Sequence, residues 1–406
     1  MKIVHSCHGK FHHQDLARQL HRLGVLHTFF TGYPRFKLKN LNVPWNKVNT
    51  FPWLEVPYYA GMRYGLLNAR LRREMEWQVH EVFDRHVARQ MPEADAYIGL
   101  SCASLRAGRV IKQRGGKYLC DRGSSHIRYQ DRLLAEEHDR HGIPYISIDR
   151  RVIEKEMAEY EMADAILVPS EFARRSFIAE GVPESKLRKV SYGVDLRRFS
   201  PVGAPEAGRF DVLFVGAASL RKGVPDLLNA YRMLRHPRKR LRFIGAVTEE
   251  VRAFLQRACG SDPSIEILGP RPQDLLREIM STAHVMVLPS IEEGLALVQA
   301  QALACGCPVI ASTNTGSEDL FTDGIEGFVV PIRSPEVIAE RLQWIADDRD
   351  LQSDLHEAAL RRAQAIGGWD RYGESILSAV RNLADERAQN IECQHVACDA
   401  RGPVNE

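Results

Sequence analysis

One segment constrains the fold of this chain more than any other, because residues 285–312 read as strand, polar turn, helix and strand. The apolar run 284–288 contains two β-branched valines and ends at a proline, which is typical of a strand buried on both faces. Apolar residues recur at helical spacing from Leu295, and Gly306 is placed to cap the helix before a second proline. We therefore predict a helix that begins at the carboxyl end of a buried strand.

The polar turn between that strand and that helix carries two acids, Glu292 and Glu293. Open α/β sheets bind ligands at the carboxyl ends of their strands, and the free N–H groups of a helix's first turn favour an anion such as phosphate. We expect those donors at Leu295, Ala296 and Leu297. Glu293 would lie beside the anion and accept hydrogen bonds from hydroxyl groups. The predicted ligand carries both a phosphate and hydroxyls, as a nucleotide sugar does.

The segment closely resembles the donor-binding motif of the retaining glycosyltransferases of family 4, or group 1, in which two glutamates are separated by seven residues. Glu293 takes the first place, which in the family contacts hydroxyls of the donor sugar. The second place is Gln301, about 12 Å further along the helix and so towards the ribose. Because Gln offers one acceptor oxygen and a donor amide, this departure concerns ribose affinity. The alternative is that Glu292 and Glu293 are solvated turn residues and the helix is ordinary core.

A second loop carries two adjacent cations, Arg221 and Lys222, after a predicted strand. Cations there would neutralise a diphosphate and stabilise it as a leaving group. In the family an Arg early in this loop and a Lys before a Gly hold the diphosphate, and Lys222 matches the Lys. The early Arg is absent, since Ala217 and Ala218 stand in its neighbourhood, and whether Arg221 compensates stays open. Read alone, the two cations are ordinary surface charges.

The first half offers weaker matches to the family. A family histidine lies near the reacting sugar in a loop after a strand, and His126 is the nearest match. Asp121 and Arg122 are close enough in the sequence to orient it, and a structural histidine is the equal alternative. Gly9 matches the close-approach glycine of the first loop, and Lys10 is a lesser candidate for a phosphate or acceptor contact.

Strand-like and helix-like segments alternate in both halves of the 406 residues, which predicts two parallel sheets covered by helices. The resemblance implies an α/β GT-B fold, in which two doubly wound Rossmann-like domains face each other across a cleft. We expect an acceptor-side domain over residues 1–200, a nucleotide-sugar-binding domain over 201–368, a helix over 369–387 that returns to the first domain, and a disordered polar tail over 388–406. The predicted strands span residues 2–6, 96–100, 117–120, 165–168, 212–215, 241–245, 265–268, 285–288 and 309–311.

The net charge and the cysteine content indicate which binding partners and which cellular compartment to expect. A net charge of +3 gives no reason to expect nucleic acid. The first fifty residues are locally basic, which suits an anionic acceptor, a membrane surface or simply a solvated face. We see no signal peptide and no transmembrane segment, and the eight cysteines form no CxxC pair, so we expect a reduced cytoplasmic protein that could associate peripherally with the inner face of a membrane.

The resemblance implies retaining transfer of a hexose from a nucleotide sugar to an unidentified acceptor: a glycan, a lipid-linked molecule or a small molecule. Neither a metal nor a cofactor is expected, because cations and a helix N-terminus supply the positive charge. The alternatives are a GT-B nucleotide-sugar isomerase and a catalytically weakened sugar-nucleotide-binding protein. The predicted catalytic residues are Glu293, Lys222, His126 and Arg221, and the predicted donor-binding residues are Gly9, Gly216, Gly294, Leu295, Ala296, Leu297 and Gln301.

Overall fold

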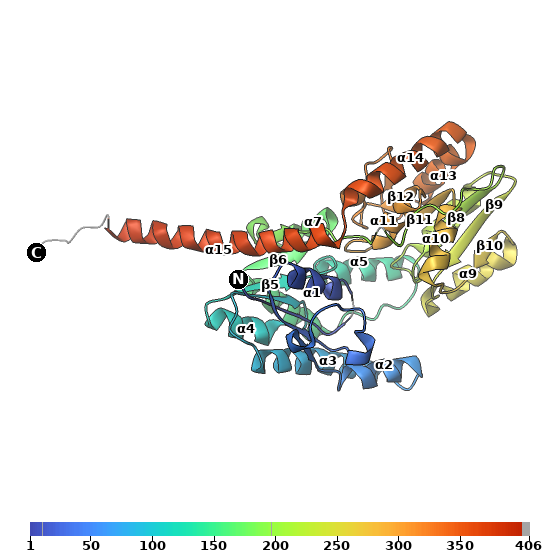
Figure 1. The fold of residues 1–406 in the computed structure, drawn as a ribbon. Coiled ribbons are helices and arrows are strands. Elements are labelled where there is room, and N and C mark those ends of the chain that lie inside the picture. The colour runs from blue at the N-terminus through green and yellow to red at the C-terminus, as the bar shows by residue number, and fades with distance from the viewer. Residues whose placement is uncertain (10, 196, 400–406) are drawn as a thin grey trace, which may run out of the picture.

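A computed structural model of the chain describes residues 1–9, 11–195 and 197–399, without the side chains of residues 386–399. Two parallel sheets organise it, one of seven strands and one of six, each covered by helices (Figure 1). We call the parts around the two sheets the first and the second domain. The first sheet contains β1 (Ile3–Cys7), β2 (Leu26–Thr31), β3 (Val48–Thr50), β4 (Ala96–Leu100), β5 (Lys117–Asp121), β6 (Ala165–Val168) and β7 (Leu187–Lys189). The second contains β8 (Phe210–Val215), β9 (Lys239–Ile244), β10 (Ile265–Ile267), β11 (Val285–Leu288), β12 (Val309–Ser312) and β13 (Gly327–Val330).

Helices connect the strands in both domains. In the first domain they are α1 (His13–Arg22), α2 (Glu55–Arg63), α3 (Ala69–Arg89), α4 (Leu105–Gln113), α5 (Ile127–Arg140), α6 (Arg150–Met162) and α7 (Glu171–Ala179). In the second they are α8 (Val224–Met233), α9 (Glu249–Ser261), α10 (Gln273–Ser281), α11 (Leu297–Ala304), α12 (Ser317–Leu320), α13 (Pro335–Asp347) and α14 (Arg349–Ile366), followed by α15 (Trp369–Asp399). Short 3-10 turns lie at Arg35–Lys37, Trp45–Lys47 and Glu184–Lys186.

The strand order places a ligand-binding crevice in each domain. The first sheet runs β3-β2-β1-β4-β5-β6-β7 and the second β10-β9-β8-β11-β12-β13. The order reverses at β1 and β4 in the first sheet and at β8 and β11 in the second, and such switch points open a crevice beyond the carboxyl ends of the strands. In the second sheet Met286 of β11 pairs with Leu213 of β8, so the two predicted donor-binding loops emerge side by side.

The sequence predicted the buried central strands and missed those with weaker patterns. The expected β4, β6 and β11 are confirmed at their predicted bounds, and every residue of β11 is buried. The missed strands are β2, which contains a histidine and two threonines, the three-residue strands β3 and β7, and β13, which begins at a glycine. Three of these four, β3, β7 and β13, lie at sheet edges, and β3 and β7 are too short to show an apolar pattern.

The last helix returns to the first domain. Helix α15 packs against α1, and Arg22 Nη2 lies 3.0 Å from Glu374 Oε1. The helix runs on to Asp399, through most of the segment that we expected to be disordered. The helix therefore extends past the end that the sequence predicted at residue 387. Among the described residues, no helix is both long and apolar enough to span a membrane.

Candidate donor and acceptor site

A cavity of about 650 Å³ lies between the two domains, at the carboxyl ends of both sheets. Its size suits a small organic ligand. The first domain contributes Phe11, His12, His13, Leu100, Ser101, Arg122, Gly123, Ser124 and Tyr192, and the second contributes Val215, Gly216, Arg221, Lys222, Glu293, Gly294, Leu295, Ala296, Leu297, Val298 and Gln301. The structure therefore brings nine of the eleven predicted site residues to one cavity, and the other two, Gly9 and His126, do not line it.

Glu293 and Lys222 form an ion pair on the wall of the second domain. Ser290 Oγ also donates to Glu293, at 3.2 Å from Oε2. Lys222 is only 7% exposed, and burial lowers the pKa of its ammonium, with the Glu293 carboxylate acting in the opposite direction. Gly223 follows with a φ of +67°, and a Cβ there would lie 2.1 Å from the Pro289 carbonyl oxygen. The close contact between these loops therefore requires glycine and holds Lys222 against the Glu293 turn.

Arg221 and Glu292 tie the two second-domain loops together. Arg221 Nη1 donates to the Glu292 carbonyl oxygen at 3.0 Å and lies 3.5 Å from Glu292 Oε2. Burial alone would raise the pKa of the Glu292 carboxyl, but the Arg221 charge and the hydroxyl and amide donors of the first domain lower it below its ordinary value. Arg221 is part of the cavity wall while already holding this acid. Glu292, which the sequence offered as a solvated turn residue, is fully buried.

Glycine at position 294 allows the domains to touch. A Cβ on Gly294 would lie 2.1 Å from the Gly123 carbonyl oxygen and 2.9 Å from the Ser124 Cα, both in the first domain. Any larger side chain would have to push the domains apart at the cavity. Gly294 is therefore a position where the backbone itself forms part of the site.

Helix α11 begins two residues later than the sequence predicted. Its first residue is Leu297, and Ala296 occupies the N-cap position. The N–H of Ala296 already donates to the Thr315 carbonyl oxygen at 3.1 Å, so the expectation that it binds an anion is wrong. The first N–H groups of a helix have no acceptor within the helix, and those of Leu297 and Val298 belong to residues on the cavity wall. The N-terminal end of α11 thus lines the same cavity as Lys222 and Glu293.

Gln301 lies on the same helix and on the same cavity wall. It is partly buried, and among the described residues its side chain has no hydrogen-bond partner. Its carboxamide is therefore available to a ligand that reaches along α11.

His126 does not line the cavity, contrary to the predicted catalytic role. It is the N-cap of α5, where its Nδ1 accepts from the Arg128 N–H at 3.3 Å. Its ring packs between Tyr160 and Phe177, with centroids 5.2 and 5.0 Å away, and burial lowers its pKa to about 3. The structural alternative is the one that this geometry supports. The expected partner Arg122 instead lies 2.9 Å from Glu156.

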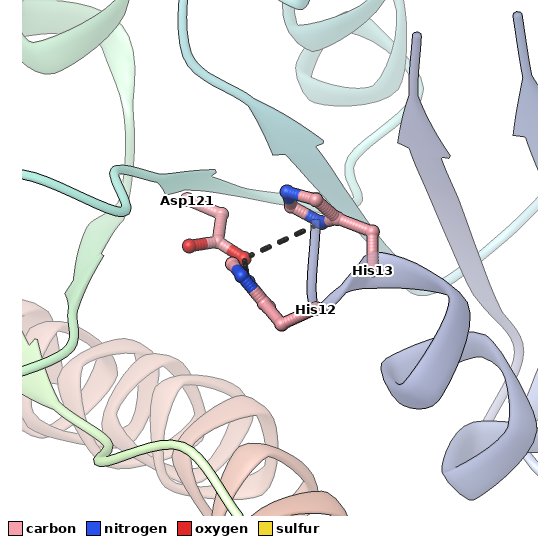
Figure 2. Close-up of side chains that lie close together, drawn as sticks. All are labelled: His12, His13 and Asp121. Carbon is pink, nitrogen blue, oxygen red and sulfur yellow. Dashed lines mark hydrogen bonds and ion pairs between the residues drawn. The ribbon is translucent and has the colours of Figure 1, made fainter. Parts of the chain in front are cut away.

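The histidines at the cavity are His12 and His13, which sequence reasoning missed. They begin α1 just after β1, and Asp121 ends the nearby strand β5 (Figure 2). His12 Nε2 lies 2.9 Å from Asp121 Oδ2, and His13 Nδ1 lies 3.7 Å from the same oxygen. Burial lowers the pKa of His13 well below its ordinary value, which keeps that ring neutral. The signal in the sequence was the histidine pair that follows the Gly9 loop at the start of a helix.

Gly9 and Lys10 are the two residues of the first loop that the sequence predicted at the site. Gly9 lies against the ring of Phe11, which would be 2.8 Å from a Cβ at position 9. Gly9 itself does not line the cavity. Lys10 lies outside the described residues.

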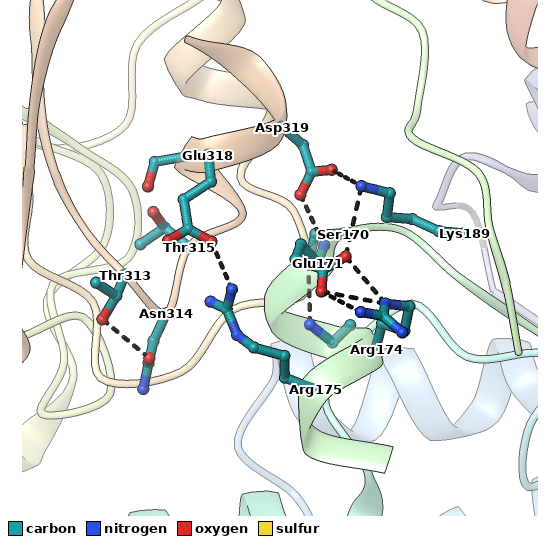
Figure 3. A network of polar contacts seen from close by, with 12 residues as sticks. Ser170, Glu171, Arg174, Arg175, Lys189, Thr313, Asn314, Thr315, Glu318 and Asp319 are labelled. Atoms are coloured by element: carbon teal, nitrogen blue, oxygen red, sulfur yellow. Dashed lines mark hydrogen bonds and ion pairs between the residues drawn. The ribbon is translucent and has the colours of Figure 1, made fainter. Parts of the chain in front are cut away.

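A polar network fixes the domains beside the cavity (Figure 3). Asp319 of α12 accepts the Glu171 N–H at 2.7 Å and pairs with Lys189 Nζ at 2.7 Å. Arg175 of α7 lies 2.8 Å from Glu318. The predicted N-cap Ser170 is confirmed, since its Oγ accepts from the Ala173 N–H of α7. The network joins the ends of helices from both domains, which fixes how the two cavity walls face each other.

Comparison with known proteins identifies the family of the second domain. Residues 197–362 match the family described as glycosyl transferases group 1. The chain is 32% identical over 250 residues to a D-inositol 3-phosphate glycosyltransferase of Kribbella flavida. The aligned region covers 56% of the chain and 58% of the relative. A protein of the same description from Geodermatophilus obscurus is 31% identical over 259 residues, covering 59% and 56%. The chain therefore matches somewhat more than half the length of these relatives.

Solved structures share the whole fold. The sucrose-phosphate synthase of Thermosynechococcus elongatus superposes with a TM-score of 0.70 at 20% identity, over 95% of this chain and all of that one. Anabaena HepE, solved in complex with UDP, superposes with a TM-score of 0.68 at 15% identity, over 94% of this chain and all of that one. This likeness, together with the two facing parallel sheets, confirms the GT-B fold expected from the sequence.

Proposed function

Since residues 197–362 match the family of glycosyl transferases group 1, we propose that the chain transfers a hexose from a nucleotide sugar to a hydroxyl-bearing acceptor, with retained configuration. The observation that carries this proposal is the position of Lys222 and Glu293 side by side on one wall of the cavity, next to the start of α11. A cation and free N–H groups suit a diphosphate, and a carboxylate suits the hydroxyls of the sugar attached to it.

The mechanism follows from these groups. When the bond between the sugar C1 and the phosphate oxygen breaks, its electron pair leaves with the nucleoside diphosphate, and the acceptor oxygen forms the new bond to C1. Lys222 Nζ and the N–H groups of Leu297 and Val298 are placed to stabilise the charge that develops on the diphosphate. The ion pair with Glu293 must open first, because Lys222 then binds the diphosphate and Glu293 binds sugar hydroxyls.

We also propose that the nucleotide is UDP and that the donor needs no metal. Structures of Anabaena HepE contain UDP and UDP-glucose, and that protein shares the fold. Lys222, Arg221 and the N-terminus of α11 supply the positive charge that a metal would otherwise provide.

The experiment is a thermal-shift screen of the purified protein against UDP, GDP, ADP and their glucose conjugates, followed by detection of the nucleoside diphosphate released. UDP and UDP-glucose should raise the midpoint of unfolding most, and UDP-glucose should be consumed. No shift with any nucleotide would refute the proposal. Two rival functions have distinct outcomes: an isomerase would alter UDP-glucose without releasing UDP, and a binding protein would bind it without turnover.

A second surface supports peripheral membrane association, which we propose for the acceptor side. Around α2 and the start of α3, large apolar side chains are exposed together with cations (Figure 1 locates these helices). We call this the α2 patch; its apolar members are Trp53, Val56, Tyr59, Met62, Tyr64, Leu66 and Leu71, and its cations are Arg63, Arg70, Arg72 and Arg73. Aromatic and aliphatic residues interleaved with arginines suit the headgroup region of an anionic bilayer.

Co-sedimentation with vesicles tests this surface. The protein should bind vesicles of phosphatidylglycerol and phosphatidylcholine but not vesicles of phosphatidylcholine alone. Replacing Trp53 and Leu66 by serine should abolish binding, and Trp344→Ser, which replaces an exposed tryptophan of the second domain, is the control. Equal binding by the patch variant and the control would refute the membrane proposal without affecting the donor site.

A further inference from the structure

His12 is held rigidly on the first-domain wall of the cavity. Its Nε2 lies 2.9 Å from Asp121 Oδ2 (Figure 2). Its ring stacks on Tyr192 with centroids 4.1 Å apart and lies 4.1 Å from the His13 ring, while Tyr372 of α15 meets it edge-on at 5.9 Å. Partners from three other parts of the chain, together with the neighbouring His13, thus fix the orientation of one imidazole. Such restraint is typical of a side chain that must present one atom accurately.

Asp121 decides which nitrogen of His12 is free. A carboxylate can only accept hydrogen bonds, so the proton of the imidazole lies on Nε2, which donates a hydrogen bond to Asp121. The other nitrogen, Nδ1, keeps a lone pair. Among the described residues no group bonds to Nδ1, and this nitrogen is not one of the buried atoms that lack a partner. Because His12 lines the cavity, its Nδ1 is a hydrogen-bond acceptor open to a ligand.

Phe11 shows what kind of ligand fits beside that nitrogen. Its side chain lines the same cavity although the residue is 69% exposed. The ring lies close over Gly9, where a Cβ would come within 2.8 Å of it, so glycine permits this placement. An exposed aromatic face suits the C–H face of a sugar ring, whose hydroxyls need hydrogen-bond partners at the edge. A ring surface and an acceptor nitrogen on adjacent residues match a carbohydrate.

We propose that His12, oriented by Asp121, binds the attacking hydroxyl of a carbohydrate acceptor whose ring lies on Phe11. This rests on the proposed transfer from a nucleotide sugar. The hydroxyl donates to His12 Nδ1 and approaches the sugar C1 from the same face that the diphosphate leaves, so the configuration is retained. As its oxygen bonds to C1 and the C1–phosphate bond breaks, its proton passes to Nδ1 and the electron pair of the broken bond leaves with the nucleoside diphosphate. The Asp121 carboxylate then stabilises the imidazolium. His12 is thus a catalytic residue, and Asp121 is a positioning residue.

The same cluster has a competing use as a metal site. His12, His13 and Asp121 each offer one ligand atom, and these atoms lie within 4.8 Å of one another. Both ring nitrogens of the buried His13 lack a hydrogen-bond partner. The acceptor assignment is favoured because Nε2 of His12 already lies at hydrogen-bonding distance from Asp121, and because only His12 offers an open nitrogen. The experiment therefore includes a metal measurement.

Asp121→Asn is the sharpest variant. An asparagine amide that donates to Nε2 would move the imidazole proton to Nδ1, which could then no longer accept. The assay uses UDP-glucose as donor and glucose, galactose and mannose as acceptor probes. In both Asp121→Asn and His12→Ala, the rate of product formation that depends on the acceptor sugar should fall by at least about 100-fold. The Kd for UDP should stay within about twofold of wild type, because neither residue belongs to the proposed diphosphate contacts. His27→Gln, a histidine in β2 away from the cavity, is the matched control.

Variants of Phe11 give a second test. Because Phe11 is exposed, replacing it does not disturb a buried position. Phe11→Ala should raise KM for the acceptor sugar with little change in kcat, and Phe11→Trp should restore it. Equal transfer by wild type, His12→Ala and Asp121→Asn would overturn the inference, as would wild type that forms no product with any of the sugars while still binding UDP. One equivalent of a transition metal, lost in His12→Ala and in His13→Ala, would overturn it in favour of a metal site. Failure of wild type to bind UDP at all would instead refute the proposed function.

Discussion

Glu292 of the second domain accepts hydrogen bonds from both the Oγ of Ser125, at 2.7 Å, and its N–H, at 3.2 Å, and Ser125 belongs to the first domain. Ser124 Oγ and Gln130 Nε2 add donors at 2.6 and 2.9 Å. One fully buried carboxylate therefore joins the domains directly behind Glu293. The two adjacent acids thus have different surroundings, since Glu292 joins the two domains and Glu293 lines the cavity.

Glu292→Gln should destabilise the protein, because the amide turns a donor towards groups that themselves donate. Losing hydrogen bonds to a buried charge costs about 1.5–3 kcal/mol, which lowers the midpoint of thermal unfolding by at least about 3 °C. Since the pKa of Glu292 is lowered on folding, its stabilisation is present at neutral pH and is lost as pH falls below about 4.5. The difference between variant and wild type should therefore shrink in acid. Glu357→Gln, at an exposed ion pair within α14, is the control, and equal melting of both variants would contradict this role.

How much the sequence could predict depended on how local the signal was. The buried strand β11, the turn with Glu293 and the cap at Ser170 follow from neighbouring residues alone, and all three lie where they were expected. The start of α11 was misplaced because the Ala296 N–H is taken by Thr315, which lies on another loop. A contact between loops leaves no trace in helical periodicity.

Long-range pairing also explains the misassigned histidine. His126 lies five positions after Asp121, which made it the natural partner in the sequence, but the chain turns its ring into the core of the first domain. His12, which is 109 residues from Asp121 along the chain, reaches that carboxylate because β1 and β5 end at the same edge of the sheet. Only the strand order, β1-β4-β5, brings the two together.

Lys222 should set an alkaline limit on turnover. Burial lowers its pKa below the ordinary 10.5, so kcat/KM should fall as pH rises through that lowered pKa and the ammonium of the free protein deprotonates. Lys222→Ala should reduce kcat on the order of 100-fold, by more than it weakens acceptor binding, since the cation acts on charge that develops in the transition state. Lys222→Arg should move the alkaline limb to higher pH. A kcat/KM profile unchanged in both variants would remove Lys222 from the mechanism.

Glu293→Gln should separate sugar recognition from nucleotide binding. Transfer should fall at least about tenfold, because the amide accepts more weakly from sugar hydroxyls than the carboxylate does. The Kd for UDP should be unchanged or lower, since Lys222 no longer has to leave its partner in the ion pair. Calorimetry with UDP and with UDP-glucose makes the comparison. Weaker binding of UDP itself would count against placing Glu293 at the sugar.

Nucleotide binding should not depend on a divalent cation. The Kd for UDP, measured by calorimetry, should be the same in excess EDTA and in added Mg²⁺ or Mn²⁺, because Lys222 and the N-terminus of α11 already supply positive charge. A Kd that rises at least about tenfold in EDTA and is restored by Mg²⁺ would overturn the metal-free donor site.

Gln301 tests how far along α11 the nucleotide extends. It occupies the place of a family glutamate, lies on the cavity wall, and has no side-chain hydrogen-bond partner among the described residues. If the ribose lies there, Gln301→Glu should tighten UDP binding by about 1–2 kcal/mol, because a charged acceptor makes stronger hydrogen bonds to the two ribose hydroxyls than an amide. Calorimetry with UDP and with uracil alone, which has no ribose, isolates the effect. Weaker UDP binding in this variant would mean that the Gln301 amide donates to the ligand, and the ribose would then have to lie elsewhere in the cavity.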